Sequence, residues 1–451
     1  MHTRFCLILL FSLFFGILLR AQPKQNSPYS RYGIGDLAPQ YFAAQAGMGA
    51  QTAAFHDPYH LNLANPASYA HLRATALETG LYTKFAEYES GTATAKNISG
   101  NLAYLALGFT LRSPINEVLD KKRTPWQFGM GFSVTPYSTV GYNIESQERR
   151  QDVGVVYNTF EGKGGLYRIQ WTNAVKHKNT AVGVRLGWAF GRSVYENSTQ
   201  FRAGIDTTDA TAFQNNFRDE FRMNGLVWGL GVQQDLILRY ANTREKNTPS
   251  EWLTIGGTVE GPQNFNLFAD QLRIRSRGRL FTGAYSDPDT LLKVTGKESN
   301  IQLPASLSVG LQYNKANKLK LGVQTGYSNW SVYKNPLRPE TLRNVFHVSG
   351  GVEYIPDYIS YNKFLRRVRY RAGAYYRQDP RVVNGNGVND TGITLGLGLP
   401  VILPRQQTSF VNIALEAGIL GDGTPIREQY ARVTVGFTMN DNTWFYKRRF
   451  E

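Results

Sequence analysis

"AVGVRLGWAFG", residues 181–191, places a large apolar side chain at every second position. These side chains belong to Val182, Val184, Leu186, Trp188 and Phe190. Alanines and glycines stand between them, together with one cation, Arg185. A period of two is that of a β-strand, whose successive side chains point to opposite faces. The stretch therefore predicts a strand with one bulky apolar face and one nearly bare face that carries an arginine.

The same alternation recurs from about residue 74 to the end of the chain, most clearly at 101–112, 126–134, 305–313, 320–327, 392–401, 410–420 and 431–439. A soluble β-sandwich also alternates, but its outer face is polar and carries few glycines. Here the second face is mostly Gly, Ala, Ser and Thr, which suits the interior of a closed barrel. The bulky face then points to lipid, where a sheet must close because every backbone group needs a partner. We predict an all-β, transmembrane antiparallel β-barrel with Arg185 in its lumen.

The spacing of these stretches predicts about fourteen strands. Their expected starts lie near residues 74, 97, 125, 151, 179, 217, 250, 301, 317, 343, 363, 388, 407 and 428. Residues 263–276 alternate least well. Longer polar stretches predict loops, mostly extracellular, at 113–124, 203–216, 277–300 and 378–387, and "KANK" at 315–318 predicts a tight periplasmic turn.

Residues 1–21 have the architecture of a secretory signal peptide, with Arg4 ahead of a short apolar run and a cleavage site before Gln22. The alternative is a membrane anchor, for which the run is short. Cys6 is the only cysteine and leaves with the signal, which excludes disulfides, thiol catalysis and cysteine-bound zinc. We expect the mature chain in the outer membrane of a Gram-negative bacterium.

The formal charge is +16, and +14 without Arg4 and Arg20. An exported chain that has no long run of Lys or Arg is not expected to bind nucleic acid. The sequence contains no G-x-S-x-G nucleophile motif and no phosphate-binding loop, so we predict no enzyme and no cofactor. The seven tryptophans are expected at the membrane interfaces.

Residues 22–73 do not alternate and precede the first strand. They are either a disordered periplasmic tail or a hatch folded in the lumen. A barrel of about fourteen strands has a bore too wide for its own side chains to fill, which favours the hatch. We therefore expect a hatch at 22–73, a barrel at 74–441 and a basic periplasmic tail at 442–451.

"GMGAQTAAFHDPYHLNLANPAS", residues 47–68, resembles the N-terminal signature of the FadL-type outer-membrane transporters of long-chain fatty acids. The matching hatch positions are Gly47, Met48, Gly49, Asn65, Pro66, Ala67 and Ser68. Residues 162–191, 303–313 and 326–331 resemble later parts of the family. The resemblance implies a fourteen-stranded barrel, an N-terminal hatch and passive uptake of hydrophobic compounds.

In that family the ligand leaves sideways beside a kinked third strand. The third strand here contains Pro136, which cannot donate to a ladder, and Gly131. These two residues are the candidate lateral gate. The alternative is that 135–139 form an ordinary turn between two short strands.

"RRVRYRAGAYYRQ", residues 366–378, places Arg367, Arg369, Arg371 and Arg377 on one face. On the lumen wall their guanidinium groups suit a carboxylate or phosphate, such as a fatty-acid head group. The alternative is an internal network with Glu353 and Glu416, because enclosed cations need partners.

The segment "HDPYH" holds His56, Asp57 and His60, but a proline interrupts it and no further ligand is near in sequence. We predict no metal site there.

Two functions stay open. The first is passive uptake of a hydrophobic or amphipathic ligand such as a fatty acid, with outer-membrane lipid as a further partner. The alternative is a non-transporting accessory barrel of an outer-membrane protein export or assembly complex, with other outer-membrane or periplasmic proteins as partners. "YSRYGIGDL" at 29–37 and the basic C-terminal tail depart from typical fatty-acid transporters.

A transporter needs an apolar pocket above the hatch and a lateral gap near Pro136. An accessory subunit needs a filled lumen and an apolar or aromatic patch on its loops or outer wall.

Overall fold

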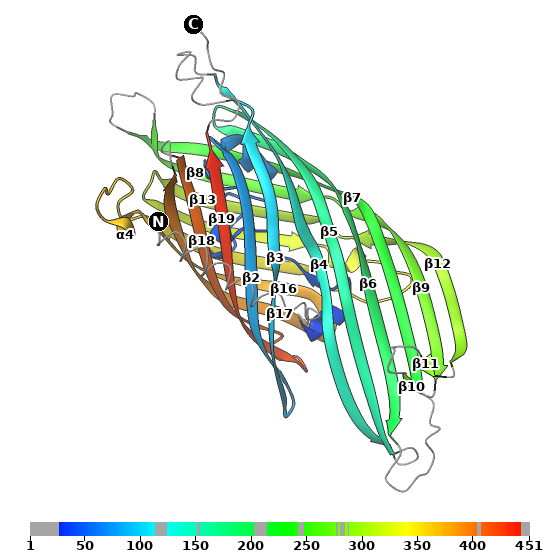
Figure 1. The fold of residues 1–451 in the computed structure, drawn as a ribbon. Coiled ribbons are helices and arrows are strands. Elements are labelled where there is room, and N and C mark those ends of the chain that lie inside the picture. The colour runs from blue at the N-terminus through cyan, green and yellow to red at the C-terminus, as the bar shows by residue number, and fades with distance from the viewer. Residues whose placement is uncertain are drawn as a thin grey trace, which may run out of the picture.

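The computed structural model is a closed antiparallel β-barrel (Figure 1). Its wall has fourteen strand positions, each of which we call a stave, whether one strand or two consecutive strands occupy it. It describes residues 27–112, 124–150, 154–202, 214–241, 248–276, 278–279, 285–286, 288–403 and 407–442. The ring closes where β19 pairs with β2 along its whole length. The expected signal peptide and most of the expected C-terminal tail lie outside the described residues.

Twelve staves are single strands: β2 (Thr75–Ser90), β3 (Ala93–Thr110), β4 (Trp126–Arg150), β5 (Gly154–His177), β6 (Thr180–Arg202), β7 (Gln214–Tyr240), β14 (Leu319–Ser328), β15 (Val345–Tyr354), β16 (Arg369–Val383), β17 (Asn386–Leu403), β18 (Gln407–Leu420) and β19 (Arg427–Asp441). Two staves are divided, one into β8 (Pro249–Glu260) and β9 (Gln263–Ser276), the other into β12 (Asp289–Leu303) and β13 (Ser306–Lys315). The small elements are η1 (Pro28–Arg31), β1 (Asp36–Leu37), α2 (Ala43–Ala46), η2 (Pro66–His71), β10 (Gly278–Arg279), β11 (Tyr285–Ser286), η3 (Trp330–Val332) and α4 (Phe364–Arg367).

The two divided staves are neighbours and break at the same level. Pro262 and Pro304 stand at the two breaks, where a proline cannot donate a ladder hydrogen bond. β12 then pairs with β9, and β13 pairs with β8. The fourteen predicted strands are confirmed, including the doubtful seventh.

Two loop predictions are wrong. Residues 289–300 belong to β12, and the stretch 378–387 contains the end of β16, a turn at Asn384–Gly385 and the start of β17. On both faces of the strand, almost every side chain of 289–300 is exposed. This stretch therefore lacks the alternation that predicts the other strands. The tight turn at 315–318 is confirmed between β13 and β14.

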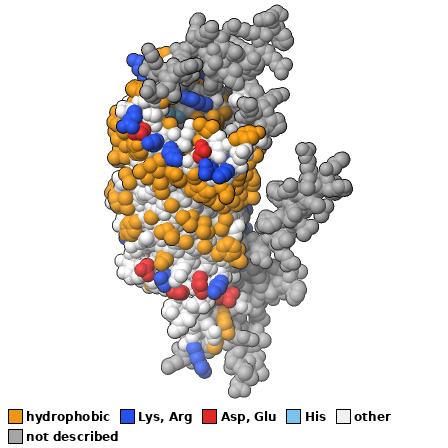
Figure 2. Space-filling model, turned by 90° about the vertical axis from the view of Figure 1, so that its left-hand side faces the viewer, with side chains coloured by type: hydrophobic (Ala, Val, Ile, Leu, Met, Phe, Trp, Pro, Cys, Tyr) orange, Lys and Arg blue, Asp and Glu red, His pale blue; other side chains and the backbone are white. Residues whose placement is uncertain are grey.

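The two faces of residues 181–191 lie as the period of two predicts. Val182 is 50% exposed on the outer wall, whereas Arg185 is 2% exposed and faces the lumen. There Arg185 pairs with Glu260 and donates to the carbonyl of Leu63. Figure 2 shows the outer side chains as an apolar band bordered by charged residues. In the described part of the chain, no helix is long and apolar enough to cross a membrane.

The N-terminal segment, residues 27–73, crosses the lumen. η2 packs against β4, β5, β6 and β7, while α2 packs against β17, β18 and β19 on the far wall. The lumen face of the barrel carries many glycines and other small residues, which makes this close packing possible. A Cβ on Gly183 would collide with the backbone of Pro66, and a Cβ on Gly351 would collide with that of Met48. Small wall residues therefore let the backbone of the segment approach the backbone of the wall.

Candidate functional site

A network of charged side chains joins the wall of the lumen to the N-terminal segment. Lys320, Glu353 and Arg371 face one another across β14, β15 and β16, because the ladder registers place them in one row. Arg371 Nε lies 2.7 Å from Glu353 Oε2, and Lys320 Nζ lies 3.4 Å from Glu353 Oε1. Asp57 completes the network from inside, with its Oδ2 2.8 Å from both Lys320 Nζ and Arg369 Nη1.

His60 fixes Asp57 from the same segment. Its Nδ1 lies 3.1 Å from Asp57 Oδ1, and Asn412 donates to its Nε2. Burial alone would raise the pKa of Asp57, but Arg369, Lys320 and His60 lower it well below its ordinary value. Burial lowers the pKa of His60 to about 4, against the opposing effect of Asp57. At neutral pH the pair is therefore a carboxylate and a neutral imidazole that donates to it.

A second cluster joins His56, His71 and Asp235. Their possible ligand atoms lie within 4.8 Å of one another, as a metal ion would require. However, Lys176 Nζ lies 3.1 Å from Asp235 Oδ2 and 3.1 Å from His71 Nδ1. The ammonium group already supplies the positive charge that Asp235 needs, so these residues do not require a metal.

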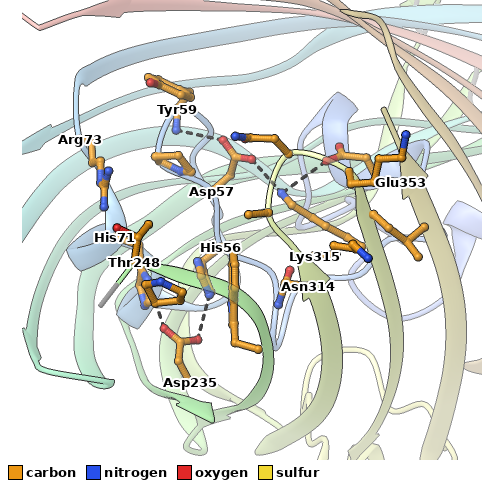
Figure 3. A pocket seen from close by; sticks show the side chains of 18 of the residues that line it. His56, Asp57, Tyr59, His71, Arg73, Asp235, Thr248, Asn314, Lys315 and Glu353 are labelled. Atoms are coloured by element: carbon orange, nitrogen blue, oxygen red, sulfur yellow. Dashed lines mark hydrogen bonds and ion pairs between the residues drawn. The ribbon is translucent and has the colours of Figure 1, made fainter. Parts of the chain in front are cut away.

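A cavity of about 410 Å³ lies between the two clusters (Figure 3). The turns Lys178–Asn179 and 316–318 border it. The first residue of β2, Thr75, and the last residue of β19, Asp441, also lie opposite each other at this end, which we call the periplasmic mouth. Seven Lys or Arg side chains and three carboxylates line the cavity.

The four candidate arginines do not form one ladder. Arg367 lies on α4, outside the strand, where its guanidinium group covers the ring of Phe364. Arg369 and Arg371 enter the internal network that the sequence left open as the alternative. Arg377 stacks on Tyr375 and donates to the Tyr41 hydroxyl.

The expected acid partners divide in the same way. Glu353 joins the network, whereas Glu416 pairs with Arg432 at 3.6 Å. Asp57 was missed as a partner, although the sequence drew attention to "HDPYH". No local signal could reveal its cationic partners on the wall, Lys320 and Arg369, which lie more than 250 positions away.

The candidate hatch residues Gly47, Gly49, Asn65, Pro66 and Ala67 all lie in the lumen. Gly49 donates its N–H to Thr394, and its φ of 66° is one that glycine adopts without strain. Gly47 approaches Gly396 so closely that neither could carry a Cβ. Asn65 caps η2 by accepting from the Ala67 N–H, and Pro66 occupies the first turn.

The extracellular half of the lumen is filled by apolar side chains. Phe221, Phe265, Leu267 and Ile301 point inward from β7, β9 and β12, and all are nearly inaccessible. The loop 329–344 folds back onto them. It contributes Trp330, Tyr333 and Leu342, and the N-terminal segment contributes Ile34.

The wall between β3 and β4 is incomplete. Their ladder runs only from Leu105–Val134 to Thr110–Gly129, and the partner register of β4 shifts at Pro136. Gly131 lies within the paired part, against the ring of Tyr69. Beyond the Leu105–Val134 pair, the partner of β4 is β1 and no longer β3, and Asp36 lies opposite Thr139. Pro136 thus marks an interruption of the wall that the N-terminal segment occupies.

A loop at the periplasmic mouth, residues 355–368, projects beside the barrel and carries α4 (Figure 1). We call it the α4 loop. Its apolar side chains are unusually accessible, with Ile359 86%, Tyr361 93% and Leu365 69% exposed. Exposed apolar groups gathered in this way mark interaction surfaces more often than scattered ones do.

A family model described as BamG matches residues 1–451, which is the whole chain. The chain belongs to the BamG family. A search of curated proteins finds no match. Among solved structures, this BamG-family barrel is similar to a Pseudomonas aeruginosa FadL homologue, at 14% identity and a TM-score of 0.57, covering 90% of this chain and 99% of that one.

It is also similar to two toluene transporters. TodX of Pseudomonas putida has 14% identity and a TM-score of 0.56, covering 91% of this chain and 100% of that one. TbuX of Ralstonia pickettii has 13% identity and a TM-score of 0.54, covering 91% and 99%. At these identities the likeness establishes the FadL-like outer-membrane barrel fold, as the sequence resemblance implied.

Proposed function

We propose that this chain is a non-transporting accessory barrel of an outer-membrane protein complex. The observation that carries the proposal is a lumen that the chain itself occupies in both halves, with a charged cavity at its periplasmic mouth. Ion-paired side chains and the N-terminal segment occupy the periplasmic half, and the loop 329–344 packs into the extracellular half. A hydrophobic solute would find its binding surface already covered.

The lateral route is occupied as well. The interruption beside Pro136 is where a ligand would leave the barrel, but β1 pairs with the β4 edge there. Ser27 N–H donates to the Gly141 carbonyl and extends the same seam. Transport would require this segment to leave.

The α4 loop supplies the surface that an accessory subunit needs. Ile359, Tyr361 and Leu365 would bury apolar area against a partner protein. The BamG name also suggests association with an outer-membrane complex. Passive uptake of hydrophobic compounds is the second candidate, favoured by the fold shared with toluene transporters.

The test is mild-detergent purification of the tagged native chain, followed by mass spectrometry of the proteins and lipids that accompany it. We expect a stoichiometric protein partner. Replacing the three exposed α4-loop residues, I359S, Y361S and L365S, should lower its recovery about tenfold or more, because buried apolar anchors dominate interfaces. The matched control is L291S and L292S, two exposed leucines on β12, which should retain the partner.

Planar-bilayer conductance tests the filled lumen directly. The intact barrel should be silent, and a variant lacking residues 27–73 should conduct. A barrel purified alone with a bound amphiphile, in cells whose uptake of hydrophobic compounds depends on this chain, would overturn the proposal in favour of transport.

A further inference from the structure

The cavity at the periplasmic mouth has more positive charge than its own acids can balance. All three lining carboxylates are already paired, Asp57 and Glu353 with Lys320 and Asp235 with Lys176. Seven cations against three acids leave four positive charges in excess when the two histidines are neutral.

Three of the lining cations have no carboxylate partner among the described residues. They are Arg73, at the end of the N-terminal segment, Lys178, in the β5–β6 turn, and Lys318, in the β13–β14 turn. Lys318 donates to the Pro356 carbonyl at 2.7 Å, and its ammonium group lies 5.1 Å from the centroid of the Tyr354 ring. A fourth, Lys315, turns toward Glu251 instead.

The ring of His71 lies in the wall of the same cavity. The Lys176 ammonium has only donors, so His71 Nδ1 must accept from it at 3.1 Å. Burial, together with nearby positive charge, lowers the pKa of His71 well below its ordinary value, so the ring is neutral and its proton stays on Nε2. Nε2 has no hydrogen-bond partner among the described residues, but it is fully buried, so a ligand in the cavity would be held by the lining cations and not by this ring.

We propose that this cavity binds a phosphate-bearing anion. The excess charge disfavours a metal ion beside Lys176, and it favours a ligand that brings acceptors. Lysines approach from separate turns as point charges, which suits a tetrahedral phosphate with several oxygens. The phosphate can belong to a free ion or to a phospholipid head group, since the chemistry is shared. This inference does not depend on the proposed function.

The experiment is calorimetric titration of the full-length barrel in non-ionic detergent with inorganic phosphate, and separately with glycerophosphoglycerol as the head-group probe. We expect saturable binding of at least one probe, weakened by added salt. The double variant K178Q/K318Q should bind about tenfold more weakly, since two of the positive charges that line the cavity are lost. The control K96Q/K293Q removes two exposed lysines elsewhere and should bind as the native chain does.

The two probes separate the sources. Binding of phosphate alone assigns a free ion, and preference for glycerophosphoglycerol assigns a lipid head group. Binding that is equal in native and K178Q/K318Q protein, or no saturable binding of either probe, would overturn the proposal. So would tight binding of Zn²⁺ without phosphate, which would assign the cluster of His56, His71 and Asp235 to a metal.

Discussion

The two halves of the lumen share one wall but are filled by different physical means. Near the periplasmic mouth, ion pairs join the N-terminal segment to the wall, as between Asp57 and Lys320. In the extracellular half, apolar side chains such as Leu267 and Trp330 exclude water without directed bonds. The charged half depends on each partner, because an unpaired buried charge is costly. The stability of the apolar half depends mainly on how completely its side chains fill the buried volume.

The largest effect should come from breaking the charged half. Glu353→Gln leaves Arg371 and Lys320 without their shared carboxylate, and it should lower the free energy of unfolding by about 4 kcal/mol. Urea unfolding in detergent, followed by tryptophan fluorescence, measures this. Glu298→Gln, at an exposed position on β12, is the control and should change little. Equal stability of the two variants would show that the network contributes nothing.

A smaller effect should come from the apolar half. Leu267→Ala removes a fully buried side chain and should cost about 3 kcal/mol through lost transfer energy and the cavity left behind. Leu307→Ala on the outer wall is the matched control, because this leucine is half-exposed in the isolated protein. The same unfolding assay applies. If both leucines cost the same, the extracellular half is not packed as described.

The pH dependence should separate the two halves. The pKa of His60 in the folded protein is about 4, below the ordinary value of 6.5, so protons favour the unfolded chain between these values. Stability from this group is complete above pH 6.5 and is lost as the pH falls toward 4. Lowering the pH from 7.5 to 5.0 should cost about 2 kcal/mol at His60, which faces Asp57, Arg369 and Arg371.

The variants make this test specific. His60→Gln should reduce the pH dependence of the unfolding free energy, and His71, whose pKa burial also lowers, should keep part of it. Leu267→Ala should keep the full slope of the native chain. A His60→Gln variant with the native slope would contradict the assignment.

Much of the barrel follows from the period of two, because lipid and lumen impose opposite requirements on alternate residues. The prediction fails where that contrast ends: the first part of β12 is exposed on both faces and reads as a loop. The prediction that the four arginines share one face of a strand also fails at Arg367, because the chain forms α4 there. The network around Asp57 could not be predicted, because pairing between positions 57 and 369 leaves no local trace.

The N-terminal segment has a consequence for how the protein folds. Ser27 donates to Glu428, which is 401 positions away on the last strand, and Lys84 of the first strand pairs with the same carboxylate. These contacts cannot form until β19 has reached β2. The segment precedes every strand of the barrel in the sequence, so it waits for the end of the sequence before it has a lumen to occupy. Contacts this distant in sequence make folding slow, and sealing of the barrel and filling of its interior become one late event.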